Sequence, residues 1–283
     1  MMKGTVQIPA IVIKNFEDAC EAGQYYTATC SHVHESEESD MAAEVRSAWY
    51  KKMRLQGFRT KVAFFNESPV GFLHMVPIEH SHWGPIGKDL MVILCSYVAN
   101  QMKGKGIGRA LLEAAEGETK KEDKKALVVC AYYYEDFWFM PALFYEKHGF
   151  IPIKRRKVTK EGEKDFLDEE AILWKIFDEL AEPPCFPKPS YAFQPIEGKV
   201  VVDLFSDPFC KPIEAQRVRE VAKEFGDKVI INEYPTDNRT IFEQYQISRA
   251  IFINGQEIGW GYIAPRDGIR KAVQEALNEL SPS

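Results

Sequence analysis

The chain has 283 residues, a length that suits one large domain or two ordinary ones. Hydrophobic residues make up 45% and charged residues 28%, the balance of a globular protein and not of a disordered one. The formal net charge of −6 argues against a protein that chiefly coats nucleic acid or anionic membrane. No apolar run approaches the ~20 residues that span a bilayer, and the first residues lack a secretory apolar core. We therefore expect a cytoplasmic protein with no nucleic-acid or membrane partner.

The six cysteines are scattered and include no CxxC pair, which is typical of a reduced protein and not of a disulfide scaffold. One group raises the question of a metal, because Cys30, His32 and His34 stand at alternate positions and His80 and His82 repeat that spacing. This is not a standard zinc spacing, and a fourth ligand would have to come from elsewhere in the fold. We interpret the histidines as loop residues and predict no metal site.

A proline-rich stretch divides the chain. Residues 179–198 hold five prolines, which cannot occupy a helix interior or a central strand and favour an extended connector. Periodic patterns resume on either side of it. We predict a first domain of residues 1–178, a linker of residues 179–198 and a second domain of residues 199–283.

The first domain has the pattern of a mixed α/β fold. Residues 89–98 are rich in Val, Ile and Leu and barely alternate, which predicts a central strand. Residues 106–117 place apolar side chains at helical offsets. The predicted elements are a helix over 42–57, strands over 60–66, 70–76 and 89–98, a helix over 106–117, a strand over 126–131, a helix around 140–148 and strands near 150–157 and 170–177. The first 40 residues match no pattern that we can place.

The second domain alternates strands and helices. Asn254-Gly255 is the strongest hairpin signal in the chain, because both residues tolerate the positive φ of a tight turn. The predicted elements are a strand over 199–205, a helix over 211–225, a strand over 228–233, a helix near 239–246, strands over 250–254 and 256–260 and a helix over 266–280.

The most informative segment is Lys103–Arg109, with the sequence KGKGIGR, between a buried strand and an amphipathic helix. Glycines there let backbone N–H groups approach an anion closely, and a helix N-terminus adds partial positive charge. Such a turn suits a pyrophosphate. The alternative is a tight strand-to-helix turn in which glycine serves only the backbone angles. The GK[ST] ending of a nucleotide-triphosphate loop is missing.

The order of these motifs resembles that of the GNAT superfamily of acyl-CoA-dependent N-acetyltransferases. In that family the pattern [RQ]-x-x-G-x-[GA] cradles the pyrophosphate of coenzyme A. Here it falls on Lys103, Gly106 and Gly108, with Lys in place of Arg or Gln. A second family motif, an aromatic pair before E-K-x-G-F, matches residues 144–150. A frequent family Asn, six residues before the tyrosine of that pair, is Phe139 here, which removes one expected side-chain contact.

The resemblance implies a GNAT fold, a mixed and mostly antiparallel sheet with flanking helices, and acetyl-CoA as co-substrate. It also implies that backbone N–H groups at the end of the central strand polarise the thioester carbonyl and that the glycine turn holds the coenzyme. The residues that it assigns to coenzyme binding are Tyr97, Val98, Lys103, Gly104, Lys105, Gly106, Ile107, Gly108 and Arg109.

The chemistry that the resemblance implies is direct attack of an amine on the thioester. Tyr145 matches the family tyrosine near the coenzyme sulfur and is the expected acid, since a free tyrosine with a pKa near ~10 is protonated at neutral pH. The alternative is a tyrosine that only packs under its helix. For the base we predict Glu79 or His80, with a water chain or a merely solvated loop as alternatives.

The aromatic-rich residues 132–138 and the loop of residues 77–83 are predicted to line the acceptor pocket, because aromatic rings and carboxylates suit a small cationic amine. They are equally typical of core and rim at a domain boundary. Members of the superfamily often form homodimers.

The second domain resembles a thioredoxin-like module. Its first strand is followed by Asp207–Ile213 and a helix, as in the opening of that fold. Together with Gly71-Phe72, Pro77–His80 and the glycine turn, this resembles the YoaP-like group of GNAT proteins. Cys210 lacks a resolving cysteine, and Arg249-Ala250-Ile251 replaces the usual proline segment. Two interpretations stay open: a thiol or redox protein that uses Cys210, with the first domain as a ligand-sensing module, or a redox-inactive module that shapes the acetyltransferase pocket or mediates dimerisation.

Overall fold

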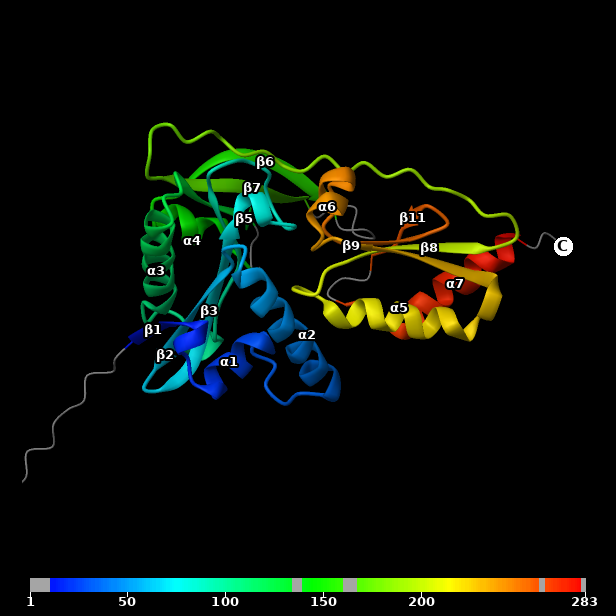
Figure 1. Ribbon diagram of the computed structural model, residues 1–283, viewed down its shortest axis with the longest axis horizontal. Coiled ribbons are helices and arrows are strands. Elements are labelled where there is room, and N and C mark those ends of the chain that lie inside the picture. The colour runs from blue at the N-terminus through cyan, green and yellow to red at the C-terminus, as the bar shows by residue number, and fades with distance from the viewer. Residues whose placement is uncertain (1–10, 134–138, 160–166, 260–262, 281–283) are drawn as a thin grey trace, which may run out of the picture.

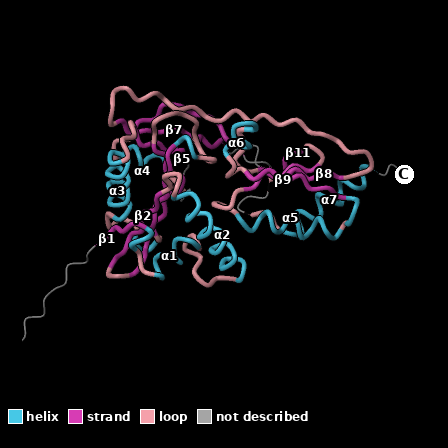
Figure 2. Tube along the Cα trace, viewed as in Figure 1, coloured by secondary structure: helices cyan, strands magenta, loops and turns pink. Residues whose placement is uncertain are grey.

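The computed structural model of the chain describes residues 11–133, 139–159, 167–259 and 263–280. Within these residues the strands form two separate sheets, one of seven strands and one of four (Figure 1). The sheets lie side by side along the longest axis of the molecule, and helices pack against each of them (Figures 1 and 2). The protein therefore consists of two α/β units. Among the described residues, no helix has both the length and the apolar character needed to cross a membrane.

The seven-stranded sheet is mixed, as predicted. Its strand order is β1-β2-β3-β4-β5-β7-β6, and every neighbouring pair is antiparallel except β4 and β5, which run parallel. The strands are β1 (Ile11–Asn15), β2 (Arg59–Phe65), β3 (Ser68–Pro77), β4 (Met91–Val98), β5 (Ala126–Tyr133), β6 (Ile151–Thr159) and β7 (Leu167–Ile176). The strands predicted after residue 59 are confirmed to within a few residues. β1 was not predicted, because a five-residue edge strand is too short for a periodic signal.

Helices cover both faces of this sheet. α1 (Glu21–Ala28) and α2 (Glu37–Arg54) pack on one face, and α3 (Ile107–Lys121) and α4 (Ala142–Lys147) pack on the other. α2 begins five residues before its predicted start because Ser36 caps it. The Ser36 Oγ accepts a hydrogen bond from the Ser39 N–H over 3.2 Å, which satisfies one of the unpaired donors of the first turn.

The second unit has a four-stranded sheet with the order β11-β10-β8-β9. β8 and β9 are parallel, whereas β10 is antiparallel to both of its neighbours. Its elements are β8 (Val200–Ser206), α5 (Pro212–Glu224), β9 (Val229–Pro235), α6 (Arg239–Tyr245), β10 (Ala250–Ile253), β11 (Gln256–Glu257) and α7 (Arg266–Leu280). The predicted hairpin is confirmed, since Asn254 and Gly255 have φ angles of 48° and 82° between β10 and β11.

The proline-rich segment crosses the molecule from the first sheet to the far end of the second (Figure 1). It is tied to both units. Cys185 exchanges two backbone hydrogen bonds with Ile86 of the first unit, over 2.8 and 2.9 Å. Further along, the Tyr191 ring stacks on Phe252 with centroids 4.0 Å apart, and its hydroxyl donates to Asp203 over 2.6 Å. The linker is thus an extended strap whose path is fixed by contacts with each unit.

A loop of the second unit, residues 207–211, inserts into the first unit, and we call it the docking loop. Phe209 is buried in the aromatic core under the first sheet, against Trp49 and Tyr50. The buried Arg46 of α2 donates to the carbonyl oxygens of Phe209 and Cys210 over 2.7 and 2.9 Å. A buried guanidinium needs such partners, so this contact joins the two units into one body.

Candidate functional site

β4 and β5 separate toward their carboxyl ends. Their parallel pairing covers only Met91–Ile93 opposite Leu127–Val129, although both strands continue for several residues. Residues 95–98 of β4 are all half-buried, which is unusual for a strand between two neighbours in a sheet. The two strands therefore diverge, and we call the region between their carboxyl ends the β4–β5 gap.

A β-bulge marks the start of this divergence. In the β3–β4 ladder His74 pairs with Cys95 and Met75 pairs with Ile93, so Leu94 is the extra residue on β4. A bulge bends its strand and increases the local twist. The bend lies one residue beyond the last β4–β5 pair, and it turns the end of β4 away from β5.

Backbone N–H groups of β4 face the β4–β5 gap at alternate residues. The Ser96 N–H points toward the gap, where it lies 3.2 Å from the Met140 sulfur, whereas the Ala99 N–H donates to Val70 on the β3 side over 2.9 Å. Because donors alternate along a strand, the Val98 N–H faces the gap and the Tyr97 N–H faces β3. Of the two backbone groups predicted to polarise a carbonyl, the Val98 N–H thus faces the gap and the Tyr97 N–H faces β3, and the Ser96 N–H, which was not predicted, also faces the gap.

The glycine turn connects the end of β4 to α3. Gly104 and Gly106 have φ angles of 78° and 84°, in the left-handed region that favours glycine, and Gly106 caps α3. A side-chain carbon added at either position would meet nothing within 4 Å, so this surface is open to a ligand. At Gly108 such a carbon would lie 2.9 Å from the Phe144 ring. The first two glycines thus serve the turn and its open surface, and the third serves packing.

The electrostatics of the turn suit an anion. The first N–H groups of a helix have no partner within the helix and carry the positive end of its dipole. The first turn of α3 holds no acidic residue. Three basic side chains surround it: Lys103 is exposed, the Lys105 ammonium lies over the Phe65 ring at 5.0 Å, and Arg109 pairs with Glu113 over 2.8 Å.

Tyr145 lies in α4 beside the β4–β5 gap and is fully buried. Its hydroxyl donates to the Met140 sulfur over 3.1 Å, and the same sulfur is 3.2 Å from the Ser96 N–H. Burial raises the pKa of Tyr145 well above its usual value, and only a hydrogen bond with Ser96 opposes this. The hydroxyl is therefore protonated at neutral pH and can act as a donor.

The two residues predicted as bases lie elsewhere. Glu79 and His80 form a short 3-10 turn after β3, and the β3–β4 ladder places Pro77 opposite Met91. Val98, at the gap, is seven residues further along β4, which corresponds to about 23 Å. The structure thus brings Tyr145, the end of β4 and the glycine turn together, but not Glu79 or His80.

Glu79 is also engaged in a local network. One carboxylate oxygen accepts from the Asp89 backbone N–H, and the other lies 3.2 Å from the Lys124 ammonium. Burial pushes the pKa of Glu79 upward, but these backbone N–H groups and Lys124 hold it below its ordinary value. At neutral pH this carboxylate is charged and paired. His80 is exposed.

Three thiols lie on the sheet face that the docking loop covers. Cys95 of β4, Cys130 of β5 and Cys210 are half-buried and pack against the aromatic core on the α2 side. Burial raises the pKa of all three, and for Cys210 burial together with the Asp207 carboxylate raises it to about 12. Cys210 is therefore a thiol at neutral pH. A reactive cysteine needs the opposite shift.

Asp207 shapes the docking loop. Its Oδ1 accepts from the backbone N–H groups of Phe209 and Cys210 over 2.8 and 2.6 Å, and the His82 ring lies 3.6 Å away. Burial pushes the pKa of Asp207 upward, but His82, the Cys210 N–H and Arg249 hold it below its usual value. This buried carboxylate fixes the turn that carries Phe209 and Cys210 toward the first unit.

Several residues singled out in the sequence have other surroundings. Phe139 packs beside Tyr132 with ring centroids 6.2 Å apart, and residues 134–138 of the aromatic-rich stretch lie outside the described residues. His32 pairs with Glu35 over 2.8 Å, and His34 contacts the Tyr25 hydroxyl over 3.0 Å. Within the described ranges, no three His, Cys, Asp or Glu side chains come together in a way that could hold a metal ion.

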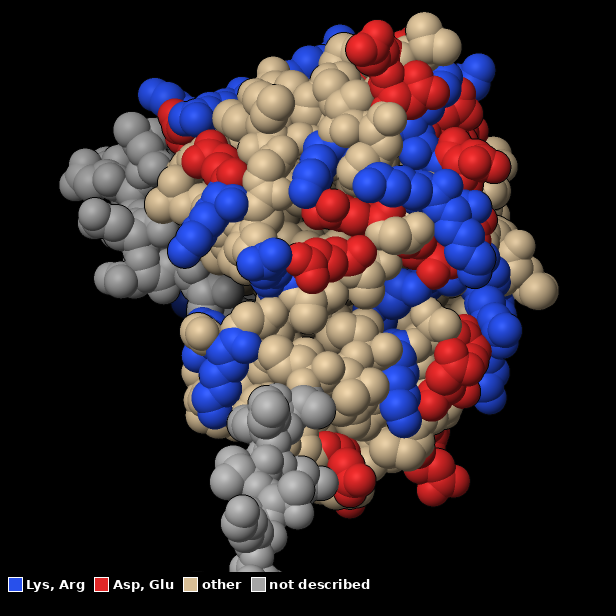
Figure 3. Space-filling view, turned by 90° about the vertical axis from the view of Figure 1, so that its left-hand side faces the viewer, with Lys and Arg blue, Asp and Glu red and all other residues tan. Residues whose placement is uncertain are grey.

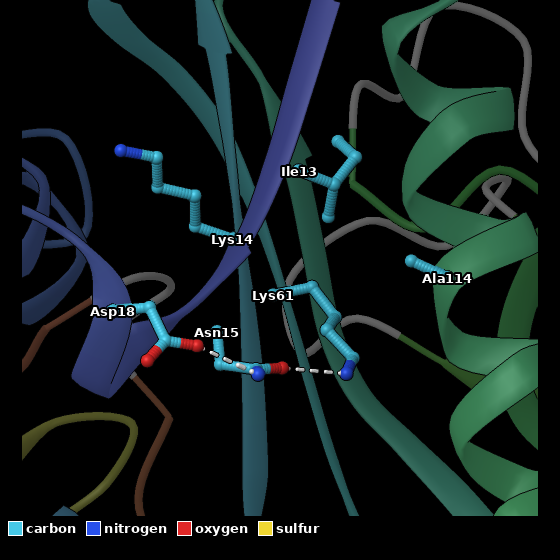
Figure 4. Close-up of a pocket in the computed structure, with 6 residues that line it drawn as sticks. All are labelled: Ile13, Lys14, Asn15, Asp18, Lys61 and Ala114. Carbon is cyan, nitrogen blue, oxygen red and sulfur yellow. Dashed lines mark hydrogen bonds between the residues drawn. The ribbon is translucent and has the colours of Figure 1, made fainter.

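A separate hollow of about 300 Å³ lies between β1, β2 and α3. Figure 4 shows Lys61, Asn15 and Asp18 joined at one end of it, with hydrogen bonds of 2.7 and 3.0 Å. Lys61 also pairs with Glu118 of α3 over 2.6 Å, so its charge is already balanced. On the face that contains α3 and β1, positive and negative side chains are interspersed (Figure 3). The residues that line this hollow include neither the glycine turn nor Tyr145, both of which lie beside the β4–β5 gap.

Comparison with known families agrees with this geometry. Residues 56–152, which include β4, the glycine turn and α4, match the family described as the acetyltransferase (GNAT) domain. The matched residues lie wholly within the N-terminal unit. No curated protein matches this chain.

Solved structures whose names describe acetyltransferases are similar to part of the chain. A putative GNAT acetyltransferase from Desulfovibrio desulfuricans is 18% identical, covers 59% of this chain and 99% of its own, and has a TM-score of 0.40. A putative acetyltransferase from Salmonella typhimurium, solved with acetyl-CoA, is 21% identical over 62% of this chain and 98% of its own, with a TM-score of 0.43. An N-acetyltransferase from Staphylococcus aureus is 16% identical over 60% of this chain and 99% of its own, with a TM-score of 0.42.

Proposed function

We propose that this protein is an acetyl-CoA-dependent N-acyltransferase that moves an acetyl group to the amine of a small molecule by direct attack on the thioester. The match of residues 56–152 to the GNAT acetyltransferase domain supports this activity. The single observation that carries the assignment to this chain is the glycine turn beside the β4–β5 gap. Its two left-handed glycines leave an open surface under the positive end of α3.

The residues of the turn fit the pyrophosphate of the coenzyme. The N–H groups of Ile107, Gly108 and Arg109 belong to the first turn of α3, and the side chains of Lys103 and Lys105 add positive charge beside them. Lys103 attracts a phosphate as a point charge, without the forked geometry of an arginine. In the proposed complex the thioester arm runs from the turn along the end of β4 to Tyr145.

In the proposed reaction the amine nitrogen attacks the thioester carbonyl carbon. The N–H groups of Ser96 and Val98, which face the gap, stabilise the negative charge that develops on the carbonyl oxygen. The C–S bond then breaks, and the sulfur takes a proton from the Tyr145 hydroxyl. Since Glu79 and His80 lie at the other end of β4, we assign removal of the amine proton to water in the gap.

We further propose that the second domain is a thioredoxin-like module of the YoaP-like kind and that it forms the acceptor side of the pocket. Its element order, β-α-β-α-β-β-α with the sheet order β11-β10-β8-β9, supports the first part. Cys210 packs beside Cys95 and Cys130 against the core of the first unit, and this position supports a role of the second domain on the acceptor side of the pocket. The raised pKa of Cys210 argues against the redox alternative, and six free cysteines suit a cytoplasmic protein.

The test is an acetylation assay. Purified protein is incubated with acetyl-CoA and a panel of small amines, and acetylated products are detected by mass spectrometry. The proposal predicts a product that depends on the enzyme and is reduced in a Tyr145→Phe variant. Release of coenzyme A without acetylation of any amine, or the same product yield with and without enzyme, would contradict it.

A further inference from the structure

The Met140 sulfur lies where two donors of the proposed mechanism converge. It is 3.1 Å from the Tyr145 hydroxyl and 3.2 Å from the Ser96 N–H, one on each side of the β4–β5 gap. Met140 is only 2% exposed, and its side chain belongs to the core between the sheet and α3. A thioether sulfur is thus held by the acid and by a backbone donor on β4.

We propose that the Met140 side chain takes the place of the coenzyme's thioester in the β4–β5 gap and must rotate out before acetyl-CoA can bind productively. This inference rests on the proposed function. A sulfur of the coenzyme that accepts a proton from Tyr145 needs the same position as the Met140 sulfur, and two sulfur atoms cannot share it. Met140 therefore competes with the thioester for the gap.

The backbone around Met140 is anchored, so the side chain is the moving part. The Met140 carbonyl accepts a hydrogen bond from the Tyr132 N–H over 3.0 Å, and Pro141 forms a parallel bridge with Tyr132. Met140 and Pro141 thus pair with β5 beyond the point where β4 stops pairing with it. Methionine is unbranched and has three rotatable side-chain bonds, so it can change rotamer without moving this anchor.

The conformation of Met140 indicates that this position is held by its surroundings. Its φ angle of 46° lies in the left-handed region, which a residue with a side chain rarely adopts. Such conformations persist where tertiary contacts determine them, and they are frequent at ligand sites. Here the Met140 carbonyl oxygen accepts a hydrogen bond from the Tyr132 N–H, and the Met140 sulfur contacts the Tyr145 hydroxyl and the Ser96 N–H.

The competition has a measurable consequence. When only the open form binds, the apparent dissociation constant is the intrinsic one divided by the fraction of open protein. Replacing Met140 with Leu keeps the volume but removes the sulfur, so the closed form loses both contacts and the open form gains population. We expect acetyl-CoA to bind Met140→Leu about three- to tenfold more tightly than the wild type, the factor that one ordinary hydrogen bond represents. Met140→Ala, which also empties the gap, should gain at least as much.

The experiment is calorimetric titration of the wild type and both variants with two ligands. The first is acetyl-CoA. The second is adenosine 3′-phosphate 5′-diphosphate, which has the nucleotide and pyrophosphate of the coenzyme but no thioester arm. The inference predicts tighter acetyl-CoA binding by the variants and unchanged binding of the nucleotide. Equal acetyl-CoA affinity in wild type and Met140→Leu would overturn it, as would an equal gain for both ligands. If no protein binds acetyl-CoA, the proposed function itself has failed.

A second measurement follows the wild-type chain itself and uses a variant only to assign one resonance. With methyl-¹³C methionine, the Met140 methyl resonance is identified by its loss in Met140→Leu or Met140→Ala. The inference predicts that acetyl-CoA shifts this resonance and that the nucleotide leaves it in place. A Met140 methyl resonance that does not move on saturation with acetyl-CoA would overturn the inference and leave the proposed function standing.

Discussion

The Arg46 guanidinium of the first domain donates to the Phe209 carbonyl oxygen of the second over 2.7 Å, inside the core of the first domain. The same side chain also donates to the carbonyl oxygens of Ala28 and Cys210, over 3.0 and 2.9 Å. One buried charge thus satisfies backbone groups from α1 and from the docking loop. The two domains are therefore expected to unfold together and to position the proposed acetyltransferase site together.

Replacing Arg46 with Ala should destabilise the protein strongly. Three carbonyl oxygens would lose their donor, and each unpaired buried group costs about 1–3 kcal/mol, so a total on the order of 3 kcal/mol or more is expected. Urea unfolding measures this. The matched control is Arg54→Ala, because Arg54 is exposed and its ion pair with Glu17 is exposed too, so its loss should cost less than about 1 kcal/mol. Similar losses for the two variants would contradict the account of the domain contact.

Replacing Tyr145 with Phe should lower the rate of acetyl transfer by about 100-fold or more, the contribution of a positioned general acid. Because burial raises the pKa of Tyr145, its hydroxyl stays protonated at neutral and mildly alkaline pH. The wild-type rate should therefore show no loss from this group up to about pH 9. The control is Tyr234→Phe, which removes a hydroxyl bonded to Asp203 in the second domain and should leave the rate unchanged. An unchanged rate in Tyr145→Phe would show that another group protonates the sulfur.

Much of the fold follows from local sequence rules. The apolar run of residues 89–98 predicts the strand seen as β4, and the periodic residues 266–280 predict α7 with its observed bounds. The hairpin at Asn254-Gly255 follows from the positive φ angles that these two residues tolerate. In each of these cases the signal and the structure that it specifies occupy the same short segment.

The features that build the site depend on distant pairs. The β4–β5 gap results from the bulge at Leu94 and from the pairing of Pro141 with β5, and neither has a periodic signal. Glu79 is engaged by Lys124, 45 residues away, which no local pattern indicates. Met140 was missed for the same reason, because a single methionine before a helix looks like ordinary core. Its two donors come from β4 and α4.

Replacing Asp207 with Asn should make the protein less stable at neutral pH but not in acid. The native pKa of Asp207 is lowered, so its carboxylate stabilises the fold above the unfolded pKa of about 3.9. That contribution is lost as the pH falls through the lowered native pKa. The difference in unfolding free energy between wild type and variant, measured in urea, should therefore be largest above about pH 5 and shrink below it. Asp227→Asn is the control, since that side chain is 92% exposed. A difference that grows toward acid pH would contradict the assignment.

Alkylation should separate the six cysteines by burial. Cys20 and Cys185 are exposed and should react with iodoacetamide at pH 7, whereas Cys210 should stay unmodified in the folded protein because burial keeps it protonated. Peptide mass spectrometry measures the extent at each site, and denatured protein gives the full-reaction control. Rapid labelling of Cys210 in the native state at pH 7 would revive the redox interpretation of the second domain.

The central claim, that the glycine turn holds the coenzyme, is tested most directly by calorimetric titration of acetyl-CoA into three proteins: the wild type, Gly106→Ala and Gly117→Ala. Both glycines have open space where a side-chain carbon would be added, but only Gly106 has a positive φ angle and lies at the turn. The account predicts micromolar binding by the wild type, affinity within about twofold of it for Gly117→Ala, and a loss of about tenfold or more for Gly106→Ala. Equal affinity in all three proteins, or no binding by the folded wild type, would contradict it.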